Sequence, residues 1–200
     1  MFMKANNHFA EVIESSLTHF IAQSWEWDCF PTFGQLISAT DEIMTVVGIV
    51  HQIMTGSIDP SRQPFTFQKT QEELMREQPQ IFEFLKTNFS CIPIGYIING
   101  KPYHLIPYKP LKIHTFIGHA TIDQVQQMLG GGFYLNVLFG MQGQLFNLDE
   151  LLLALMRYQA TYHLLNDDQL KKSLNTYCLL IGNDYRRIKL FTGRLEELLH

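Results

Sequence analysis

The sequence predicts an α+β fold: a small β-barrel with an inserted kinked helix, followed by a C-terminal three-helix subdomain. Runs of β-branched and aromatic residues alternate with turn-forming residues between positions 17 and 53, and again after residue 93. A helix-start signal interrupts these runs at Thr70, and further signals follow residue 146. With 200 residues, of which 46% are hydrophobic, the chain can bury one large core or two small ones.

The first strands are expected within residues 18–27, 33–39 and 44–53, where β-branched and aromatic side chains are dense. Pro31 and Asp41 lie between these runs and interrupt them. The spacing of about 10 to 15 residues between runs is typical of a small twisted sheet or barrel. The N-terminal half of the chain therefore predicts β structure.

A β-hairpin is predicted where Asn99-Gly100 separates the apolar runs 94–98 and 102–106. Asn and Gly both tolerate the positive φ of a type I′ turn, which is the turn that matches the twist of two paired strands. A further strand at residues 111–117 would close the barrel.

The insertion is expected to be a kinked helix. The Thr70 hydroxyl can accept a hydrogen bond from the backbone N–H of Glu73, whose carboxylate can accept one from the N–H of Thr70, which is the pattern of a capping box. Pro79 lacks an N–H and disfavours helical geometry at the residue before it, so the helix should kink there. We expect this insertion to plug or cover the sheet. The side chains expected to turn inward are Ile81, Phe82 and Leu85.

Three short-looped helices are predicted near the C-terminus, beginning at Asn147, Asn166 and Asn183, each followed by acidic or amide residues that suit a helix start. The Gly130–Gly132 run is expected to end a helix and is a candidate hinge, rather than a phosphate-binding loop. The predicted division is an N-terminal extension at 1–16, a barrel domain with its helical insertion at 17–129, and a helical subdomain at 133–200.

Charge is scarce and unevenly distributed. The formal net charge is -4 and only 17% of residues are charged, which argues against a strongly basic nucleic-acid coat or a polybasic membrane tether. Residues 84–122 contain four lysines and no acid, and they are the only basic region. So few charges suggest that a partner covers part of the surface.

The three cysteines, Cys29, Cys91 and Cys178, are far apart in apolar surroundings, which is typical of reduced, buried thiols. The N-terminus has no apolar run with a small-residue cleavage site, and the longest apolar segments are shorter than the roughly 18 to 20 residues that cross a bilayer. We therefore expect a cytoplasmic protein with no membrane span.

The sequence predicts no enzyme, no cofactor and no metal. It has no phosphate-binding or dinucleotide-binding glycine motif, and no motif of a serine nucleophile. The nearest histidine cluster is His104, His114 and His119, but strand alternation would place residues five apart on opposite faces. Asp149 and Glu150 could pair as catalytic carboxylates, but their place in the first turn of a helix favours capping and dipole stabilisation.

The basic hairpin and its exit are the first candidate partner-binding surface. Aromatic side chains beside cations can stack on single-stranded nucleic acid, and they can also bind an anionic protein surface. The alternative is structural: the rings pack on the sheet while the lysine heads face water. The candidate residues are Lys101, Tyr103, Tyr108, Lys109 and Lys112.

The loop at residues 55–64 is the second candidate. Asp59 can accept a hydrogen bond from its own downstream backbone, and pairing with Arg62 would hold a rigid turn. A purely structural turn is one interpretation. The other is a docking loop with Arg62, Phe65 and Phe67 as anchors.

Three segments, Phe33-Gly-Gln-Leu-Ile37, Val47-Gly-Ile-Val-His-Gln-Ile53 and Thr55-Gly-Ser-Ile-Asp-Pro-Ser-Arg62, resemble the HAS-barrel. This is the small N-terminal β-barrel of HerA-type translocation ATPases and of ATP synthase catalytic-ring subunits. The chain is also similar to cyanobacterial and plastid-lineage proteins built on that barrel, and the resemblance covers roughly residues 17–117. It implies an assembly and docking role, without an ATPase core or catalytic residues, and a plastid stroma location for a plastid-lineage protein.

These observations favour a non-enzymatic adaptor or assembly factor that docks on a larger protein complex through its β-barrel and C-terminal helices. A protein complex is the expected partner, and no small-molecule ligand is evident. The alternative is a single-stranded nucleic-acid-binding protein that uses the Tyr/Lys hairpin. A small hydrolase is a third hypothesis, which would require a pocket joining polar residues of the barrel and the helices.

Overall fold

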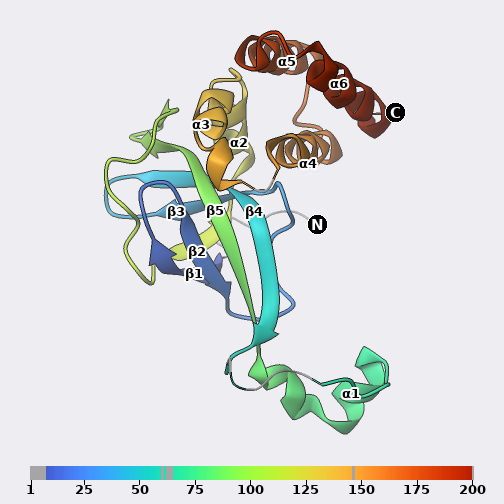
Figure 1. Cartoon of the computed structure of the whole chain (residues 1–200). Coiled ribbons are helices and arrows are strands. Elements are labelled where there is room, and N and C mark those ends of the chain that lie inside the picture. The colour runs from blue at the N-terminus through green and yellow to red at the C-terminus, as the bar shows by residue number, and fades with distance from the viewer. Residues whose placement is uncertain (1–7, 60, 62–64, 146, 200) are drawn as a thin grey trace.

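The fold is a closed six-stranded antiparallel β-barrel with helices packed on one side, as the sequence predicts (Figure 1). The computed structural model describes residues 8–59, 61, 65–145 and 147–199. The strand order is β2-β1-β7-β3-β4-β5-β6, and pairing of β2 with β5 closes the ring, so that β6 is an additional strand on β5. The strands are β1 (His8–Ser15), β2 (Phe20–Ser24), β3 (Leu36–Thr40), β4 (Thr45–Ser57), β5 (Leu85–Ile98), β6 (Lys101–Tyr103) and β7 (Phe116–His119).

Parts of strands β3, β4 and β5 are buried on both faces, namely residues 36–37, 46–50 and 91–96. Along β4, Val46 and Val50 point into the barrel core, whereas Val47 and Ile49 belong to a second core that is shared with the helices. Strand alternation sends successive side chains to opposite faces, so a wall that is covered on both sides needs a continuous apolar run. This requirement accounts for the unbroken run at the start of β4.

The barrel begins earlier in the chain than expected. Strand β1 lies within the residues assigned to an N-terminal extension, and it pairs with β2 on one side and β7 on the other. The closing strand is also displaced, because β7 spans Phe116–His119 and not residues 111–117. Leu111 still contributes to the barrel core, from a segment that is not a strand.

The predicted hairpin turn is confirmed. Asn99 and Gly100 have φ values of 50° and 75°, as a type I′ turn requires, and Tyr96 pairs with Tyr103 across the hairpin. Its two strands are unequal, since β5 is 14 residues long and β6 only three. The long strand β5 runs on through the barrel wall.

Five α-helices follow the barrel strands, where three were expected. The capping signals at Asn147 and Asn166 are confirmed, and Gly130 caps the end of a helix, as the glycine run predicts. The last helix was expected to begin at Asn183 but begins at Tyr185, and Asp184 accepts from the Arg187 N–H. The sequence analysis missed the start of α2 and all of α3. No helix among the described residues is long and apolar enough to cross a membrane. The helices are α1 (Gln71–Glu77), α2 (Ile122–Leu129), α3 (Tyr134–Gly140), α4 (Leu148–Thr161), α5 (Asp167–Ile181) and α6 (Tyr185–Leu199).

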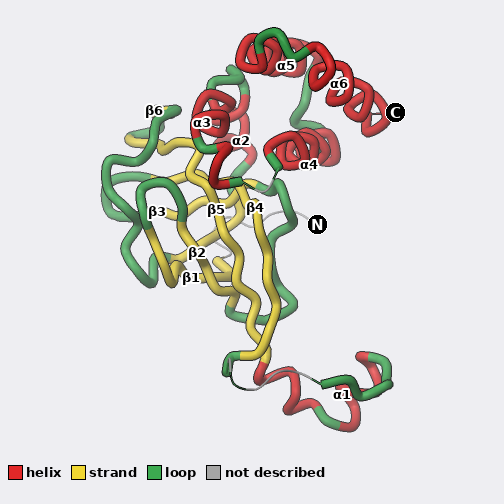
Figure 2. The backbone as a smooth tube through the Cα atoms, viewed as in Figure 1, coloured by secondary structure: helices red, strands yellow, loops and turns green. Residues whose placement is uncertain are grey.

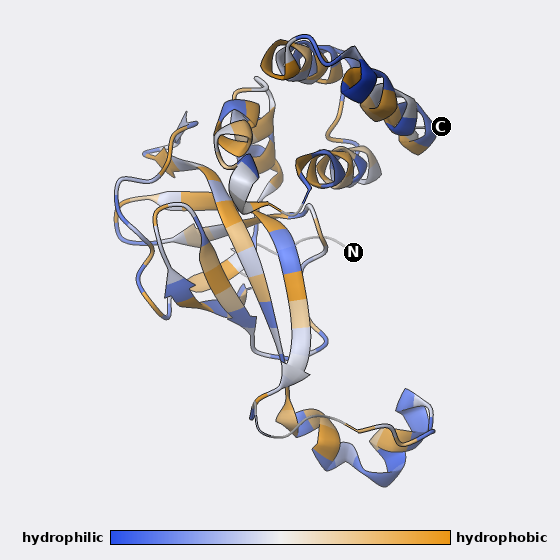
Figure 3. Cartoon of the chain, in the orientation of Figure 1, coloured by the Kyte–Doolittle hydropathy of each residue, from blue (hydrophilic) through white to orange (hydrophobic). Residues whose placement is uncertain are grey.

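The helices after residue 121 and the barrel share one apolar core. Leu36, Ile92 and Ile94 of the barrel wall belong to the same buried cluster as Leu152 and Leu155 of α4. Figure 3 shows the apolar colouring of the strands facing these helices. The helical part is therefore a cover for one side of the barrel.

The insertion does not plug or cover the sheet, contrary to the prediction. Beyond the barrel, residues 55–57 of β4 and 85–87 of β5 continue as a two-stranded ribbon that carries α1 and a 3-10 helix, Pro79–Phe84 (Figure 2). The helix break before Pro79 is confirmed. Neither helix contains a buried residue, so Ile81, Phe82 and Leu85 do not enter the barrel core.

Two half-buried histidines are expected to make stability depend on pH. Burial lowers the pKa of His51, with a contribution from His19, and burial also lowers the pKa of His119. As the pH falls below 6.5, these two histidines therefore bind protons in the unfolded chain before they do so in the folded chain, and the free energy of unfolding decreases. We expect a lower urea midpoint at about pH 5.5 than at about pH 7.5.

A double variant, His51→Gln with His119→Gln, tests this assignment. The pH dependence between these two values should become smaller in the variant, whatever its absolute stability, because the carboxylates titrate at lower pH. An unchanged pH dependence would show that other groups are responsible.

Candidate protein-docking surfaces

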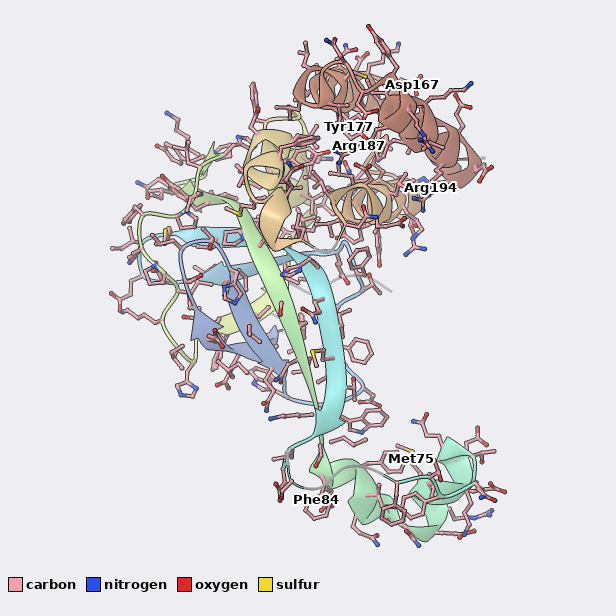
Figure 4. The ribbon with its side chains drawn as sticks, viewed as in Figure 1. Met75, Phe84, Asp167, Tyr177, Arg187 and Arg194 are labelled. Atoms are coloured by element: carbon pink, nitrogen blue, oxygen red, sulfur yellow. The ribbon has the colours of Figure 1, made fainter. Side chains whose placement is uncertain are left out.

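The insertion forms an arm, defined here as residues 58–84, which projects from the barrel at the end opposite the C-terminal helices (Figure 1). Large apolar side chains are exposed along it: Phe65 is 73% exposed, and about half of each of the other side chains faces water. Met75 and Phe84 mark its tip and its base in Figure 4. The exposed apolar residues of the arm are Ile58, Phe65, Met75 and Phe84.

The base of the arm is anchored to the barrel. The Ile58 N–H donates to the Phe84 carbonyl oxygen at 2.8 Å, and the Phe82 ring stacks on Trp27 with centroids 5.4 Å apart. The Thr87 hydroxyl donates to the Trp27 carbonyl oxygen. These contacts hold the base of the arm against the loop after β2.

The helix of the arm is capped internally. The capping box is complete, because Thr70 accepts from the Glu73 N–H and Glu73 accepts from the Thr70 N–H. Lys69 pairs with Glu77 at the far end of the same helix. The helix start and the Lys69–Glu77 pair are therefore satisfied within the arm, while Phe65, Met75 and Phe84 are exposed.

The predicted docking loop lies at the start of the arm. Asp59 accepts from the backbone N–H and the hydroxyl of Ser61, and these hydrogen bonds lower the pKa of its carboxyl. Phe65 contacts Phe67, with ring centroids 4.5 Å apart, and Phe67 is half-buried. Arg62 lies outside the described residues, so its predicted pairing with Asp59 stays a prediction.

Two lysines at the exit of the basic hairpin pair with acids of the β3–β4 turn, Lys109 with the buried carboxylate of Asp41 and Lys112 with the exposed carboxylate of Glu42. Lys109 Nζ lies 2.9 Å from Asp41 Oδ2, and Lys112 Nζ lies 3.2 Å from Glu42 Oε1. Burial opposes ionisation of Asp41, but hydrogen bonds from Lys109 and the backbone outweigh it and lower its pKa. Two of the three candidate lysines are therefore engaged within the chain.

The tyrosines of the hairpin pack mainly on each other. Tyr103 stacks on Tyr96 with centroids 5.2 Å apart, and Lys101 lies over the Tyr103 ring at 5.3 Å. Tyr108 meets Tyr96 edge-on and is 57% exposed. This packing matches the structural alternative for the rings, with Tyr108 the most exposed of the three.

A third surface is the turn between α5 and α6, which we call the crest. Leu179 is 82% exposed and Tyr185 is 76% exposed, on either side of Gly182, whose positive φ of 68° ends α5. Two basic residues, Arg186 and Lys189, are exposed on the same part of α6. The apolar residues of the crest are Leu179, Leu180, Tyr185 and Leu190.

Asp149 and Glu150 connect α4 to α6. Both backbone N–H groups are capped by Asn147, and Asp149 forms a bidentate pair with Arg187, with both N···O distances 2.8 Å. The hydroxyl of buried Tyr177 also donates to Asp149, and burial together with this charge raises the pKa of Tyr177. Figure 4 shows Tyr177 and Arg187 side by side. These contacts assign Asp149 a structural role.

Glu150 pairs with Arg194 beside a pocket of about 360 Å³ between α4, α6 and the β2–β3 loop. The polar residues that line this pocket all come from α4 and α6, and the barrel contributes only Phe33. The pocket does not join polar residues of the barrel and the helices, which the hydrolase hypothesis requires. Its lining residues are Phe33, Glu150, Leu153, Ala154, Arg157, Arg194, Glu197 and Leu198.

The three histidines considered for metal binding have separate partners: His104 contacts the Met128 carbonyl oxygen, His114 pairs with Glu11, and His119 contacts Gln35. Within the described part of the chain, no group of three or more His, Cys, Asp or Glu side chains is arranged to hold a metal ion.

All three cysteines are free thiols, and the expectation that they are buried holds in part. Cys91 is fully buried, and burial raises the pKa of its thiol well above the usual range. Cys178 is half-buried, whereas Cys29 is exposed, contrary to the expectation of burial.

Sequence reasoning missed several residues of these surfaces. The sequence analysis did not name Met75, Phe84 or Leu179 as candidates. Strands β4 and β5 are 13 and 14 residues long, beyond the usual length of about 3 to 10 residues, but polar residues interrupt both segments, so no apolar run in the sequence marks their full length. The excess residues form the ribbon that carries the arm.

No protein-family model matches the chain, and no curated protein matches it significantly. The HAS-barrel resemblance therefore stays a prediction, and the function must be argued from the surfaces alone.

Proposed function

We propose that this protein is a non-enzymatic adaptor or assembly factor that docks on a larger protein complex through the arm and the C-terminal helices. The observation that carries the proposal is the arm: its helices contain no buried residue, yet it exposes Phe65, Met75 and Phe84. Exposed aromatic and methionine side chains are typical anchors of protein interfaces.

Ordering a residue costs about 1 to 2 kcal/mol of conformational entropy, and burial of apolar surface is the main compensation. The arm gains little of that compensation until a partner covers it, because its helices contain no buried residue and only a few of its side chains, such as Phe67 and Phe82, are half-buried. A protein with an apolar groove would supply it.

The net charge of the arm indicates which residues of the partner would surround that groove. Residues 58–84 contain five acids against three bases, so a partner with basic residues around its groove would be steered toward the arm. The acids are Asp59, Glu72, Glu73, Glu77 and Glu83, and the bases are Arg62, Lys69 and Arg76.

The crest supports the second half of the proposal. It lies across the barrel from the arm, so one copy of the protein can contact two partners at once (Figure 1). The pairing of Lys109 and Lys112 within the chain favours this reading over nucleic-acid binding by the hairpin, since counterion release depends on cations that are available to phosphates.

The test is a tagged purification from the native cell with nuclease treatment, at low and at moderate salt. The arm variant carries Phe65→Ser, Met75→Ser and Phe84→Ser, and we expect it to lose protein partners that the wild type retains. Because all three side chains are exposed, the free energy of unfolding should change by less than about 1 kcal/mol.

The matched control carries Leu105→Ser and Ile106→Ser, which remove exposed apolar side chains from the loop after the hairpin. It should retain the same partners as the wild type. Equal loss of partners from both variants would contradict docking through the arm. Nuclease-sensitive nucleic acid as the only companion would instead support the hairpin alternative.

A further inference from the structure

The outer wall of the barrel carries an aromatic group built around one carboxylate, on strands β1 and β7 and the residue after β2. We call it the Trp25 face. The Trp25 indole N–H donates to Glu11 Oε1 at 2.9 Å, and His114 Nδ1 lies 3.1 Å from Glu11 Oε2. Phe116 meets Trp25 edge-on at 5.5 Å, and His8 lies 5.5 Å from Phe116 on its other side.

Strand alternation explains why these side chains point outward. Ala10 and Val12 of β1 are fully buried in the barrel core, so Glu11 between them faces the outside. Register then places Phe116 of β7 directly opposite Glu11. The rings lie on the outer surface because the alternate residues of the same strands, such as Ala10 and Val12, point into the barrel core.

The face is exposed but internally fixed. Trp25 is 53% exposed and Phe116 is 49% exposed, while the hydrogen bonds to Glu11 hold the indole and the imidazole in place. Hydrogen bonds from His114 and Trp25 also lower the pKa of Glu11, so the carboxylate stays charged at neutral pH. A rigid aromatic surface therefore surrounds a permanent negative charge.

The Asp, Glu, Lys and Arg residues of the segment that contains Glu11 and Trp25 are all acidic. Residues 5–61 contain seven acids and no lysine or arginine. Five of these acids, Glu14, Glu26, Asp28, Glu42 and Asp59, are exposed, and Glu26 and Asp28 follow Trp25 closely. Asp41 and Glu42 pair with Lys109 and Lys112, and Lys112 lies two residues before His114 of the Trp25 face. The segment 5–61 itself supplies no lysine or arginine to balance Glu11, Glu26 or Asp28.

We propose that the Trp25 face binds an arginine-rich segment of a partner protein. A guanidinium group can lie against an aromatic ring and donate to a carboxylate at the same time, which a compact ammonium group does less well. Glu11 accepts one bond on each oxygen, and each oxygen has a further lone pair for a guanidinium N–H. The proposal does not depend on the arm, which is a separate surface.

The proposal is tested with the full chain and a fluorescein-labelled peptide of alternating arginine and glycine. Anisotropy should rise with protein concentration and saturate, and binding should weaken as salt is added. A lysine–glycine peptide should bind more weakly, and a glutamate–glycine peptide should not bind. Glu11→Gln removes the charge but keeps the shape, and we expect about tenfold weaker binding.

Two further variants make the result specific. Trp25→Leu removes the ring and should also weaken binding by about tenfold. Glu196→Gln makes the same charge change at an exposed residue of α6 and should leave binding unchanged. Equal weakening by Glu11→Gln and Glu196→Gln would show that only net charge matters and would overturn the proposal. Absence of saturable binding up to about 1 mM protein would also overturn it. If only the arm variant loses binding, the peptide binds the arm and not the Trp25 face, which also overturns the proposal.

Discussion

Replacing Gly34 by alanine should destabilise the protein by about 2 to 5 kcal/mol. Gly34 has a φ of +81°, which residues with a Cβ adopt only with strain. An added Cβ would lie 2.7 Å from the Ala154 Cβ and 2.8 Å from its carbonyl carbon, so α4 would have to move away from the barrel. Urea unfolding followed by circular dichroism measures the loss.

Gly56→Ala is the matched control. Gly56 lies in the ribbon part of β4, its φ is not positive, and nothing lies within 4 Å of its added Cβ. The same methyl group should therefore change the free energy of unfolding by less than about 0.5 kcal/mol. Equal effects at the two positions would contradict a close contact between the barrel and α4.

Asp149→Ala should cost about 2 to 3 kcal/mol of stability. The substitution removes the acceptors of the Arg187 guanidinium and of the Tyr177 hydroxyl, so it leaves one cation and one buried hydroxyl without their partner. The Asn147 cap remains, because it binds the backbone of the helix. Chemical unfolding in urea would measure the effect.

The neighbouring residue provides the comparison. Glu150 pairs with Arg194 in an equally bidentate way, but both side chains are more exposed, at 42% and 51%. Glu150→Ala should cost less than about 1 kcal/mol, because exposed ion pairs contribute little. A similar cost for both substitutions would assign the effect to the charge at the helix N-terminus instead of to the buried network.

Local signals in the sequence were sufficient where structure depends on local contacts. The capping box at Thr70, the break before Pro79 and the Asn99-Gly100 turn all form as predicted, because each depends on residues within four positions of each other. Strand β2 lies within a predicted β segment, and β3 and β4 start within theirs, since the density of β-branched residues is a local property. Both continue past the predicted ends at residues 39 and 53, and β4 does so by four residues.

The arrangement of these elements depends on contacts that no local pattern records. Ile81 and Phe82 have the spacing of a buried helix face, but whether the helix turns back to the barrel depends on the length of the ribbon beneath it. The register of β7 is set by β1 and β3 together, both distant in sequence. α2 begins at a Thr121/Gln124 capping box that the sequence does contain, so that omission was avoidable.

The candidate surfaces also combine features that a local sequence pattern predicts with contacts between residues far apart in the chain. Phe65 was identified because an aromatic residue beside a turn is a local signal, and it is indeed exposed. The partners of Lys109 and Lys112 could not be found in this way, because Asp41 and Glu42 lie far away in the chain and meet the lysines only in the closed barrel. The Trp25 face likewise combines residues from both ends of the barrel sequence.

Closure of the barrel has a consequence for the order of folding. Strand β1 begins at His8, and its pairing partner for that residue is Gly118 of β7. During synthesis the first strand therefore emerges long before the strand that will cover its second edge, and the loop to be closed is nearly as long as the barrel sequence itself. Until β7 is made, the growing chain carries open strand edges of the kind that other chains can join, so the ribosome-bound intermediate is the stage most exposed to misassembly.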